Sequence, residues 1–162
     1  MTPILLLEEY FLTRLQVDYA YPGTSPTITV GAVNCNFDYD LATHRDEPKR
    51  RMLRLKVEFQ EVDDKQEKVG YRIQCEIVGF FSFTESTPQG KEEYVIRVNG
   101  INMLYGTLRG ALATTTAVFP GGRFSVPNVM PNEIVADVEK RREQERQKAA
   151  AAPAGQPAPG GT

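Results

Sequence analysis

The sequence predicts a single α+β domain: a four-stranded antiparallel sheet, a long helix that covers one of its faces, and a second, C-terminal helix. Two observations favour this class. Four segments alternate apolar and polar residues with period two, the pattern of strands that have one buried face. One later segment repeats its apolar residues at helical spacing. Because parallel strands buried on both faces would be continuous apolar runs, the sheet is expected to be antiparallel.

The expected strands are four short runs of alternating residues. They lie at 11–21, 33–39, 53–59 and 71–77. The polar segment DDKQEK (63–68) suits a hairpin between the third and fourth strands. Between the first two strands, the long segment PGTSPTITVG (22–31) carries apolar Ile28 and Val30. We expect this crossover loop to lie over the structure as a flap.

The fourth run changes its alternation at Val78–Gly79, where the sequence continues as VGFFSF. An isolated glycine at such a change predicts a β-bulge. Beyond it, Phe80, Phe81 and Phe83 are expected to lie on both faces of the sheet, so that part of the polar face becomes apolar. Alternatively, the following ESTPQGK loop covers this strand end.

The long helix is expected in NMLYGTLRGALATTTAVFPGG (102–122), with Asn99 as a suitable N-cap. At about 100° per residue, six residues fall on one face that can cover the dry side of the sheet. They are Ile101, Leu104, Tyr105, Leu108, Leu112 and Thr115.

Small residues form a stripe on the opposite side of this helix. They are Gly106, Gly110, Ala113 and Ala117. Small side chains let another backbone approach closely. Since no remaining segment is long enough to cover the stripe, we expect a helix of a second copy there, and the predicted oligomer interface also includes Arg109. Loops of the same chain are the alternative cover.

The last helix is expected to begin after Asn132 as its N-cap. Its apolar residues are Ile134, Val135 and Val138, after which EKRREQERQK is wholly polar, with i, i+3 pairs such as Glu139 and Arg142. Such a helix docks by its first turns and then projects into water. The Ala/Pro/Gly-rich tail at 149–162 is expected to be disordered, which leaves a domain at 1–148.

Composition excludes several classes of protein. The chain has 162 residues, 41% of them hydrophobic, and a net charge of −2, so no charge imbalance favours nucleic acid or an anionic membrane. The start lacks the basic region of a signal peptide, and no stretch is long enough to span a membrane. Cys35 and Cys75 are interpreted as buried free thiols of a cytoplasmic protein.

The sequence offers little for catalysis. It has no Gly-rich phosphate loop, no nucleophile elbow and no metal-ligand spacing, and its single histidine, His44, lies in a charged loop. A hotdog-type acyl-thioester enzyme is the main enzymatic alternative, but residues 99–117 lack the carboxylate such enzymes usually carry. Basic residues in KRRMLR (49–54) are diluted by nearby acids, so nucleic-acid binding is not favoured. We therefore expect no enzyme, no metal and no cofactor.

What remains is a protein with apolar surface to spare, at the aromatic end of the fourth strand, on the crossover loop and on the last helix. Exposed apolar patches usually serve the recognition of other proteins.

Three stretches resemble the SecB family of protein-export chaperones: YRIQCEIVGFFSF, NMLYGTLRG and FPGGRFSVPNV. In the second, Asn102, Leu104, Tyr105 and Arg109 match the family's asparagine, leucine, aromatic and arginine. The likeness covers roughly residues 10–138, and the order of the elements also agrees.

The resemblance implies a cytoplasmic homotetramer, a dimer of dimers with the long helices between two eight-stranded sheets. It also implies ATP-independent holding of unfolded preproteins in apolar grooves and their delivery to the SecA motor, without nucleic acid or membrane insertion. The groove residues implied here are Ile28, Val30, Phe80, Phe81, Phe83, Val126, Ile134 and Val138.

The chain departs from the family in places that matter for SecA. Glu76 matches one acidic position used for SecA contact, but Gln16 and Ala20 stand where other acids are expected, with Asp18 nearby. Gly106 replaces a proline, and the acidic C-terminal tail is absent. A SecB-like adaptor dedicated to one toxin–antitoxin or mobile-element partner is therefore the alternative to a general export chaperone.

Overall fold

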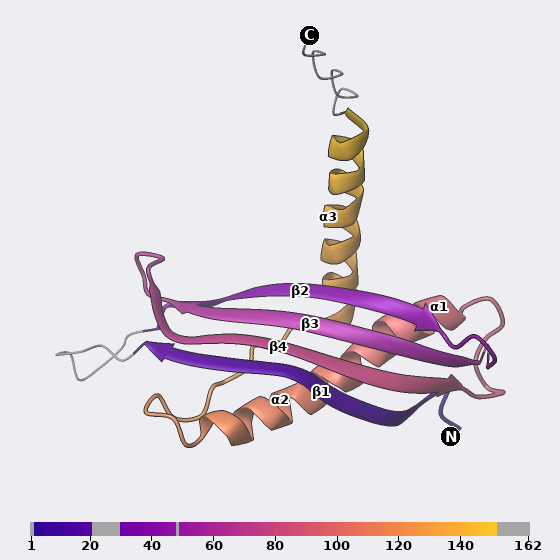
Figure 1. The fold of residues 1–162 in the computed structure, drawn as a ribbon, viewed down its shortest axis with the longest axis horizontal. Helices are drawn as coiled ribbons and strands as arrows, with labels where there is room; N and C mark the ends of the chain where they lie inside the picture. The colour runs from indigo at the N-terminus through magenta and orange to yellow at the C-terminus, as the bar shows by residue number, and fades with distance from the viewer. Residues whose placement is uncertain (1, 21–29, 48, 152–162) are drawn as a thin grey trace, which may run out of the picture.

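The computed structural model describes residues 2–20, 30–47 and 49–151 and has the α+β architecture that the sequence predicts (Figure 1). The strands are β1 (Leu5–Ala20), β2 (Ala32–Thr43), β3 (Arg50–Val62) and β4 (Lys68–Phe83). The helical segments are α1 (Glu92–Val95), the π-helix η1 (Ile96–Gly100), α2 (Ile101–Thr116) and α3 (Pro131–Ala151).

The strands form one antiparallel sheet in the order β1-β4-β3-β2, so the first two strands of the chain are its two edges. Residues 21–29 of the crossover loop lie outside the described residues. Helix α2 runs across one face of the sheet, and α3 passes the β2 edge and extends beyond the sheet (Figure 1). In the described part of the chain, helices thus cover one face of the sheet only.

The hydrophobic core lies between the sheet and α2. Its fully buried side chains include Leu55, Phe59, Ile73, Leu104, Leu108 and Leu112. The predicted apolar face of the helix is confirmed except at its end, where Thr116 rather than Thr115 is buried. Cys75 is a buried free thiol whose pKa burial raises to about 12, whereas Cys35 is only partly buried.

Strand β1 begins at Leu5, earlier than predicted. Its first residues were missed because two irregularities interrupt the alternation of apolar and polar residues. Its pairing with β4 shifts between Leu7 and Glu9 and again between Leu12 and Arg14. Each shift adds one residue to β1, so apolar residues three apart still reach the same face. By register with β4, the inward residues are Leu5, Leu7, Tyr10, Leu12, Leu15, Val17 and Tyr19.

The bulge predicted at Val78–Gly79 is wrong. The pairing of β4 with β3 continues without a shift past Gly79, which pairs with Leu53. Gly79 instead provides room for α2, since a Cβ there would lie 2.7 Å from the Leu104 Cδ2 atom. Aromatic side chains do lie on both faces, because Phe80 points outward and Phe81 points into the core.

The long helical segment begins at Glu92 and continues through η1 into α2, so Asn99 is not an N-cap. The backbone of Gly100 keeps helical dihedral angles, and no helix end exists there to be capped. Ile96 and Ile101 are both fully buried although they lie five positions apart, which suits the wider turn of a π-helix. The helix ends at Thr116 rather than continuing toward 122.

Helix α3 begins with Pro131, so Asn132 is not its N-cap either. Proline at the first helical position loses no hydrogen bond. The Glu133 carboxylate accepts a hydrogen bond from the Met130 N–H group at 3.4 Å, as in one half of a capping box. The helix continues to Ala151, so the first residues of the predicted tail are helical.

The connection between α2 and α3 is fastened to the core by three buried or partly buried hydroxyl groups. Thr116 Oγ1 donates to the Leu112 carbonyl at 2.7 Å and accepts the Phe124 N–H at 2.8 Å. Tyr71 donates to the Gly122 carbonyl, and Tyr105 donates to the Pro127 carbonyl. These bonds place the connection before α3 begins.

We predict that Thr116→Val lowers the free energy of unfolding by about 1–3 kcal/mol, because it leaves the buried Phe124 N–H unpaired. Thr114→Val is the matched control, since exposed Thr114 donates only to the Gly110 carbonyl. We expect the control to change stability by less than about 0.5 kcal/mol. Urea unfolding checks both variants, and equal losses would contradict this role of Thr116.

Candidate functional site

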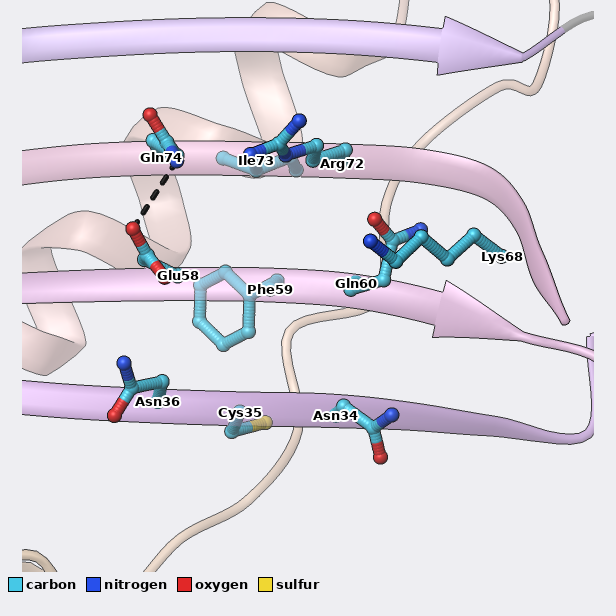
Figure 2. A pocket seen from close by; sticks show the side chains of 10 residues that line it. All are labelled: Asn34, Cys35, Asn36, Glu58, Phe59, Gln60, Lys68, Arg72, Ile73 and Gln74. Atoms are coloured by element: carbon cyan, nitrogen blue, oxygen red, sulfur yellow. Dashed lines mark hydrogen bonds between the residues drawn. The ribbon is translucent and has the colours of Figure 1, made fainter. Parts of the chain in front are cut away.

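A shallow hollow of about 210 Å³ lies on the polar face of the sheet (Figure 2). The polar side chains around it are Asn34, Asn36, Glu58, Gln60, Lys68, Arg72 and Gln74. Gln74 Nε2 donates to Glu58 Oε1 at 3.1 Å across β3 and β4. The apolar members of its lining, Phe59 and Ile73, are buried. The hollow therefore has the character of a solvated sheet face.

The edge of β2 offers a different kind of surface, because half of its backbone groups point away from β3. His44 donates its N–H to the Arg50 carbonyl at 3.2 Å, so the even-numbered positions face β3. In an antiparallel strand the backbone N–H and C=O groups of the alternate positions then point away from the neighbouring strand. The residues of the edge whose backbone groups point away from β3 are Val33, Cys35, Phe37, Tyr39, Leu41 and Thr43.

Two adjoining hollows lie against the C-terminal half of this edge, and we call them together the β2-edge groove. The first, of about 450 Å³, lies between Leu41 and Thr43 on one side and Glu92 and Ile96 on the other. The second, of about 520 Å³, lies between β2 and α3 and shares Leu41 with the first. Among the described residues, no backbone hydrogen bond from outside the sheet reaches Leu41 or Thr43.

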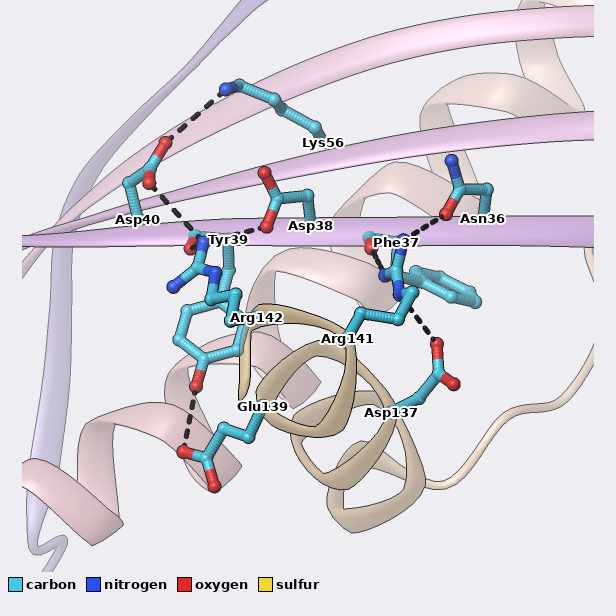
Figure 3. A network of polar contacts seen from close by, with 10 residues as sticks. All are labelled: Asn36, Phe37, Asp38, Tyr39, Asp40, Lys56, Asp137, Glu139, Arg141 and Arg142. Atoms are coloured by element: carbon cyan, nitrogen blue, oxygen red, sulfur yellow. Dashed lines mark hydrogen bonds and ion pairs between the residues drawn. The ribbon is translucent and has the colours of Figure 1, made fainter. Parts of the chain in front are cut away.

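The middle of the β2 edge is occupied by two arginines of α3 (Figure 3). Arg141 donates to the Phe37 carbonyl and, at 2.8 Å, to Asn36 Oδ1. Arg142 donates to the Tyr39 carbonyl and, at 2.7 Å, to Asp38 Oδ1. The outward carbonyls of β2 at these two positions are thus bound by side chains of a helix.

A second polar contact joins η1, α3 and β2. Arg97 bridges Glu93 and Glu139, and the Tyr39 hydroxyl donates to the same Glu139 carboxylate at 3.2 Å. The Arg142 guanidinium lies 5.2 Å from the centre of the Tyr39 ring. Burial raises the pKa of Tyr39, and the Glu139 carboxylate raises it further, whereas Arg97 and Arg142 act in the opposite direction. Glu139 and Arg142 therefore do not form the pair predicted within α3.

The structure places four of the predicted groove residues in the core. They are Phe81, Val126, Ile134 and Val138, each less than 10% exposed. Ile134 and Val138 pack in the core because they are the apolar side of the first turns of α3. Within the single chain, these four side chains are thus almost entirely covered.

Of the remaining predicted groove residues, the three within the described residues, Val30, Phe80 and Phe83, do not come together. Phe80 lies on the outer face, 6.3 Å from the ring of exposed Phe11, with the Arg50 guanidinium 5.7 Å from its ring centre. Phe83 lies on the inner face, with Arg51 5.6 Å from its ring centre. Val30 is exposed beside β2, and Ile28 lies outside the described residues.

The small-residue stripe of α2 is open in the single chain. A Cβ atom added to Gly106 or Gly110 would meet nothing within 4 Å. Arg109 is exposed between them and its guanidinium lies 3.5 Å from Asn128 Oδ1. Within the described part of the chain, loops therefore do not cover these glycines. Ala113 is partly buried and Ala117 is exposed.

The other sheet edge, β1, carries exposed apolar side chains in its N-terminal half. They are Leu6, Tyr10, Phe11 and Leu12. None of the described strands pairs with the outer side of β1. This edge is thus a second surface, distinct from the β2-edge groove, that the described residues leave uncovered.

The predicted SecA-contact residues lie on the polar outer face and are engaged within the chain. Glu76 accepts a hydrogen bond from Thr13 Oγ1 at 2.7 Å and pairs with Arg54 at 3.6 Å. Asp18 accepts a hydrogen bond from Gln16 at 2.9 Å. Basic residues alternate with the acids here, so this face is not the acidic surface that the resemblance implies.

Sequence reasoning missed the contacts along the β2 edge, above all those of Arg141 and Arg142 with its carbonyls. The sequence of a charged helix end does not reveal whether its side chains bind another element of the fold or only water. Among the described residues, no cluster of histidine, cysteine and carboxylate side chains is suited to a metal ion. No described helix has both the length and the apolar character needed to cross a membrane.

Comparison with known proteins bears on the fold. No family model matches this chain, and neither does any curated protein. A solved SecB-like chaperone from Mycobacterium tuberculosis, in complex with a ChAD peptide from the HigA1 antitoxin, is similar with a TM-score of 0.58 and 14% identity over 77% of this chain and 90% of that one. A protein of unknown function from Streptococcus agalactiae has a TM-score of 0.44 and 13% identity over 76% and 97% of the two chains. The likeness to the first shows a SecB-like fold.

We predict that Arg97→Gln loosens α3, because it removes the bridge between Glu93 and Glu139. Since half-exposed ion pairs contribute only about 0.2–1 kcal/mol each, we expect amide hydrogen exchange in α3 to rise roughly two- to fivefold. Arg146→Gln, which removes a cation of α3 with no ion pair among the described residues, is the control. Equal exchange in the two variants would contradict a role of Arg97 in docking α3.

Proposed function

We propose that this protein is an ATP-independent chaperone that binds unfolded polypeptide segments by adding them as a strand to the free edge of β2. The open backbone groups of Leu41 and Thr43 in the β2-edge groove are the observation that carries the proposal. Backbone hydrogen bonding to a sheet edge depends little on the sequence that is bound, which suits unfolded chains. The apolar side chain of Leu41, which is only partly buried, offers a contact for side chains of the segment.

The similar structure from Mycobacterium tuberculosis supports a polypeptide ligand rather than a small molecule, because it was solved with an antitoxin peptide. A holdase of this kind works by mass action, since it lowers the concentration of free, aggregating chains. On this proposal the clients include unfolded preproteins, which the chaperone keeps competent for the Sec pathway.

A SecB-like adaptor dedicated to one partner is the second candidate. The mixed charge around Glu76 and Asp18 favours it, because an export chaperone has to present a face that SecA recognises. The antitoxin peptide bound to the similar structure is consistent with such a partner. A client screen separates the two: many unfolded ligands support the chaperone, and one tightly bound partner supports the adaptor.

The assembly that we propose is a homotetramer built as a dimer of dimers. The open stripe at Gly106 and Gly110 offers a flat surface for α2 of another copy, as close helix crossings require. The uncovered β1 edge, with Tyr10 and Phe11 exposed, offers a second contact through which two four-stranded sheets could join as one of eight. Several grooves on one assembly would add avidity toward a long client.

We predict that the protein suppresses light scattering of an aggregating, chemically unfolded client at stoichiometric amounts and without ATP. Thr43→Pro should weaken client binding roughly three- to tenfold, because it removes one outward donor while proline remains tolerated at a sheet edge. Thr43→Ala, which keeps the N–H group, is the control. If the wild-type protein leaves the light scattering of the client unchanged, the chaperone proposal is contradicted. If Thr43→Pro and Thr43→Ala bind the client equally well, strand addition is contradicted.

We also predict that Gly110→Leu breaks the oligomer, because the new side chain fills space that a partner helix needs. Leucine has a higher helix propensity than glycine by up to about 1 kcal/mol, so loss of α2 itself is not expected. Gln144→Leu on the exposed side of α3 is the control. Sedimentation that shows a wild-type monomer, or an intact tetramer in Gly110→Leu, would contradict the proposed interface.

A further inference from the structure

Two arginines of α3 are hydrogen-bonded to carbonyl groups of β2 with which an added strand would have to pair. Arg141 donates to the Phe37 carbonyl, and Arg142 donates to the Tyr39 carbonyl (Figure 3). A strand that pairs with an antiparallel edge brings its own N–H groups to the outward carbonyls. These positions therefore serve either α3 or an added strand.

The space beside this part of the edge is also taken. A strand added to β2 would lie about 4.8 Å from it. The guanidinium groups of Arg141 and Arg142 already occupy this space, because they are hydrogen-bonded to the Phe37 and Tyr39 carbonyls. The guanidinium of Arg142 lies 5.2 Å from the Tyr39 ring centre, and Glu139 holds the Tyr39 hydroxyl. The docked helix thus divides the edge into an open part at Leu41 and Thr43 and a blocked part at Phe37 and Tyr39.

The blocking part of α3 is held differently from its first turns. Ile134 and Val138 are almost fully buried, at 2% and 1% exposure, and fix the start of the helix in the core. Beyond Val138 the helix reaches β2 through Arg141 and Arg142, whose side chains are both 38% exposed. Half-exposed ion pairs contribute little to stability. The later turns can therefore leave the edge while the first turns stay docked.

We propose that the arginine contact of α3 with the β2 edge is an autoinhibitory contact, which a client strand must displace in order to pair along the whole edge. The inference rests on strand addition at β2, the proposed function. It implies that short segments bind beside Leu41 and Thr43 with α3 in place, whereas longer segments compete with Arg141 and Arg142.

The alternative is that α3 covers the edge permanently, as natural proteins do to prevent edge-to-edge aggregation. In that case a long segment never displaces α3 from the wild-type protein. The two possibilities differ in what happens to α3 when a long segment binds.

The test uses the full chain and two fluorescein-labelled peptides of alternating valine and threonine with a lysine at each end. One has about eleven residues, to match the edge from Val33 to Thr43, and the other about five, to match its open end. Affinities are measured by fluorescence anisotropy for the wild type and for Arg141→Gln/Arg142→Gln. The double variant Lys140→Gln/Lys148→Gln removes the same charge from exposed positions of α3 and is the control.

We expect Arg141→Gln/Arg142→Gln to bind the long peptide roughly three- to tenfold more tightly than the wild type and the short peptide equally well. In the wild type, saturation with the long peptide should raise amide hydrogen exchange at residues 139–148, and the short peptide should not. Equal affinity of variant and wild type for the long peptide, an equal gain in the lysine control, or unchanged exchange in the wild type would each overturn this inference alone. If neither protein binds either peptide, strand addition fails and the inference fails with it.

Discussion

The constraint on which this structure depends is that one helix covers one face of a four-stranded sheet. The leucine side of α2 lies over the central strands, where Leu55 and Ile77 are fully buried. A single helix is too narrow to cover the edge strands as well, so β1 and β2 each need another solution. At β2 the chain supplies α3, and at β1 it leaves the inward-facing Tyr10 and Leu12 exposed. The functional surfaces are therefore consequences of an incomplete cover.

The sequence predicted the central strands and the long helix because their periodicity reports burial directly. It predicted the later part of β1 but missed residues 5–10, because the alternation breaks twice. Apolar residues three apart, such as Leu7 and Tyr10, were the available sign of the two shifts. It also mistook Gly79 for a bulge, because a glycine required for close approach of α2 and a glycine in a bulge read alike. Helix starts were misplaced where caps were expected at Asn99 and Asn132.

The candidate site was harder to predict than the fold for a physical reason. Apolar residues were assigned to a client groove, but a single sequence does not distinguish an apolar side chain that docks a helix, such as Ile134, from one that binds a ligand. The edge of β2 depends instead on backbone groups, which carry no sequence signal. Arg141 and Arg142 lie about a hundred residues from the carbonyls they bind, with |i−j| of 104 and 103, so no local pattern reveals the contact.

A sheet edge used for binding has to be protected against unwanted pairing, and the element that covers it has to be displaced when a client binds. Each half-exposed contact of Arg141 or Arg142 is worth about 0–1 kcal/mol, and each backbone hydrogen bond to an added strand about 0.5–1.5 kcal/mol. Exchanging two arginine contacts for two strand bonds is then nearly balanced. The outcome depends on the further backbone hydrogen bonds at Leu41 and Thr43. A short segment binds only beside Leu41 and Thr43, whereas a longer extended segment gains enough bonds to displace the two arginines. The weakness of the arginine contact itself therefore selects for extended, unfolded chains.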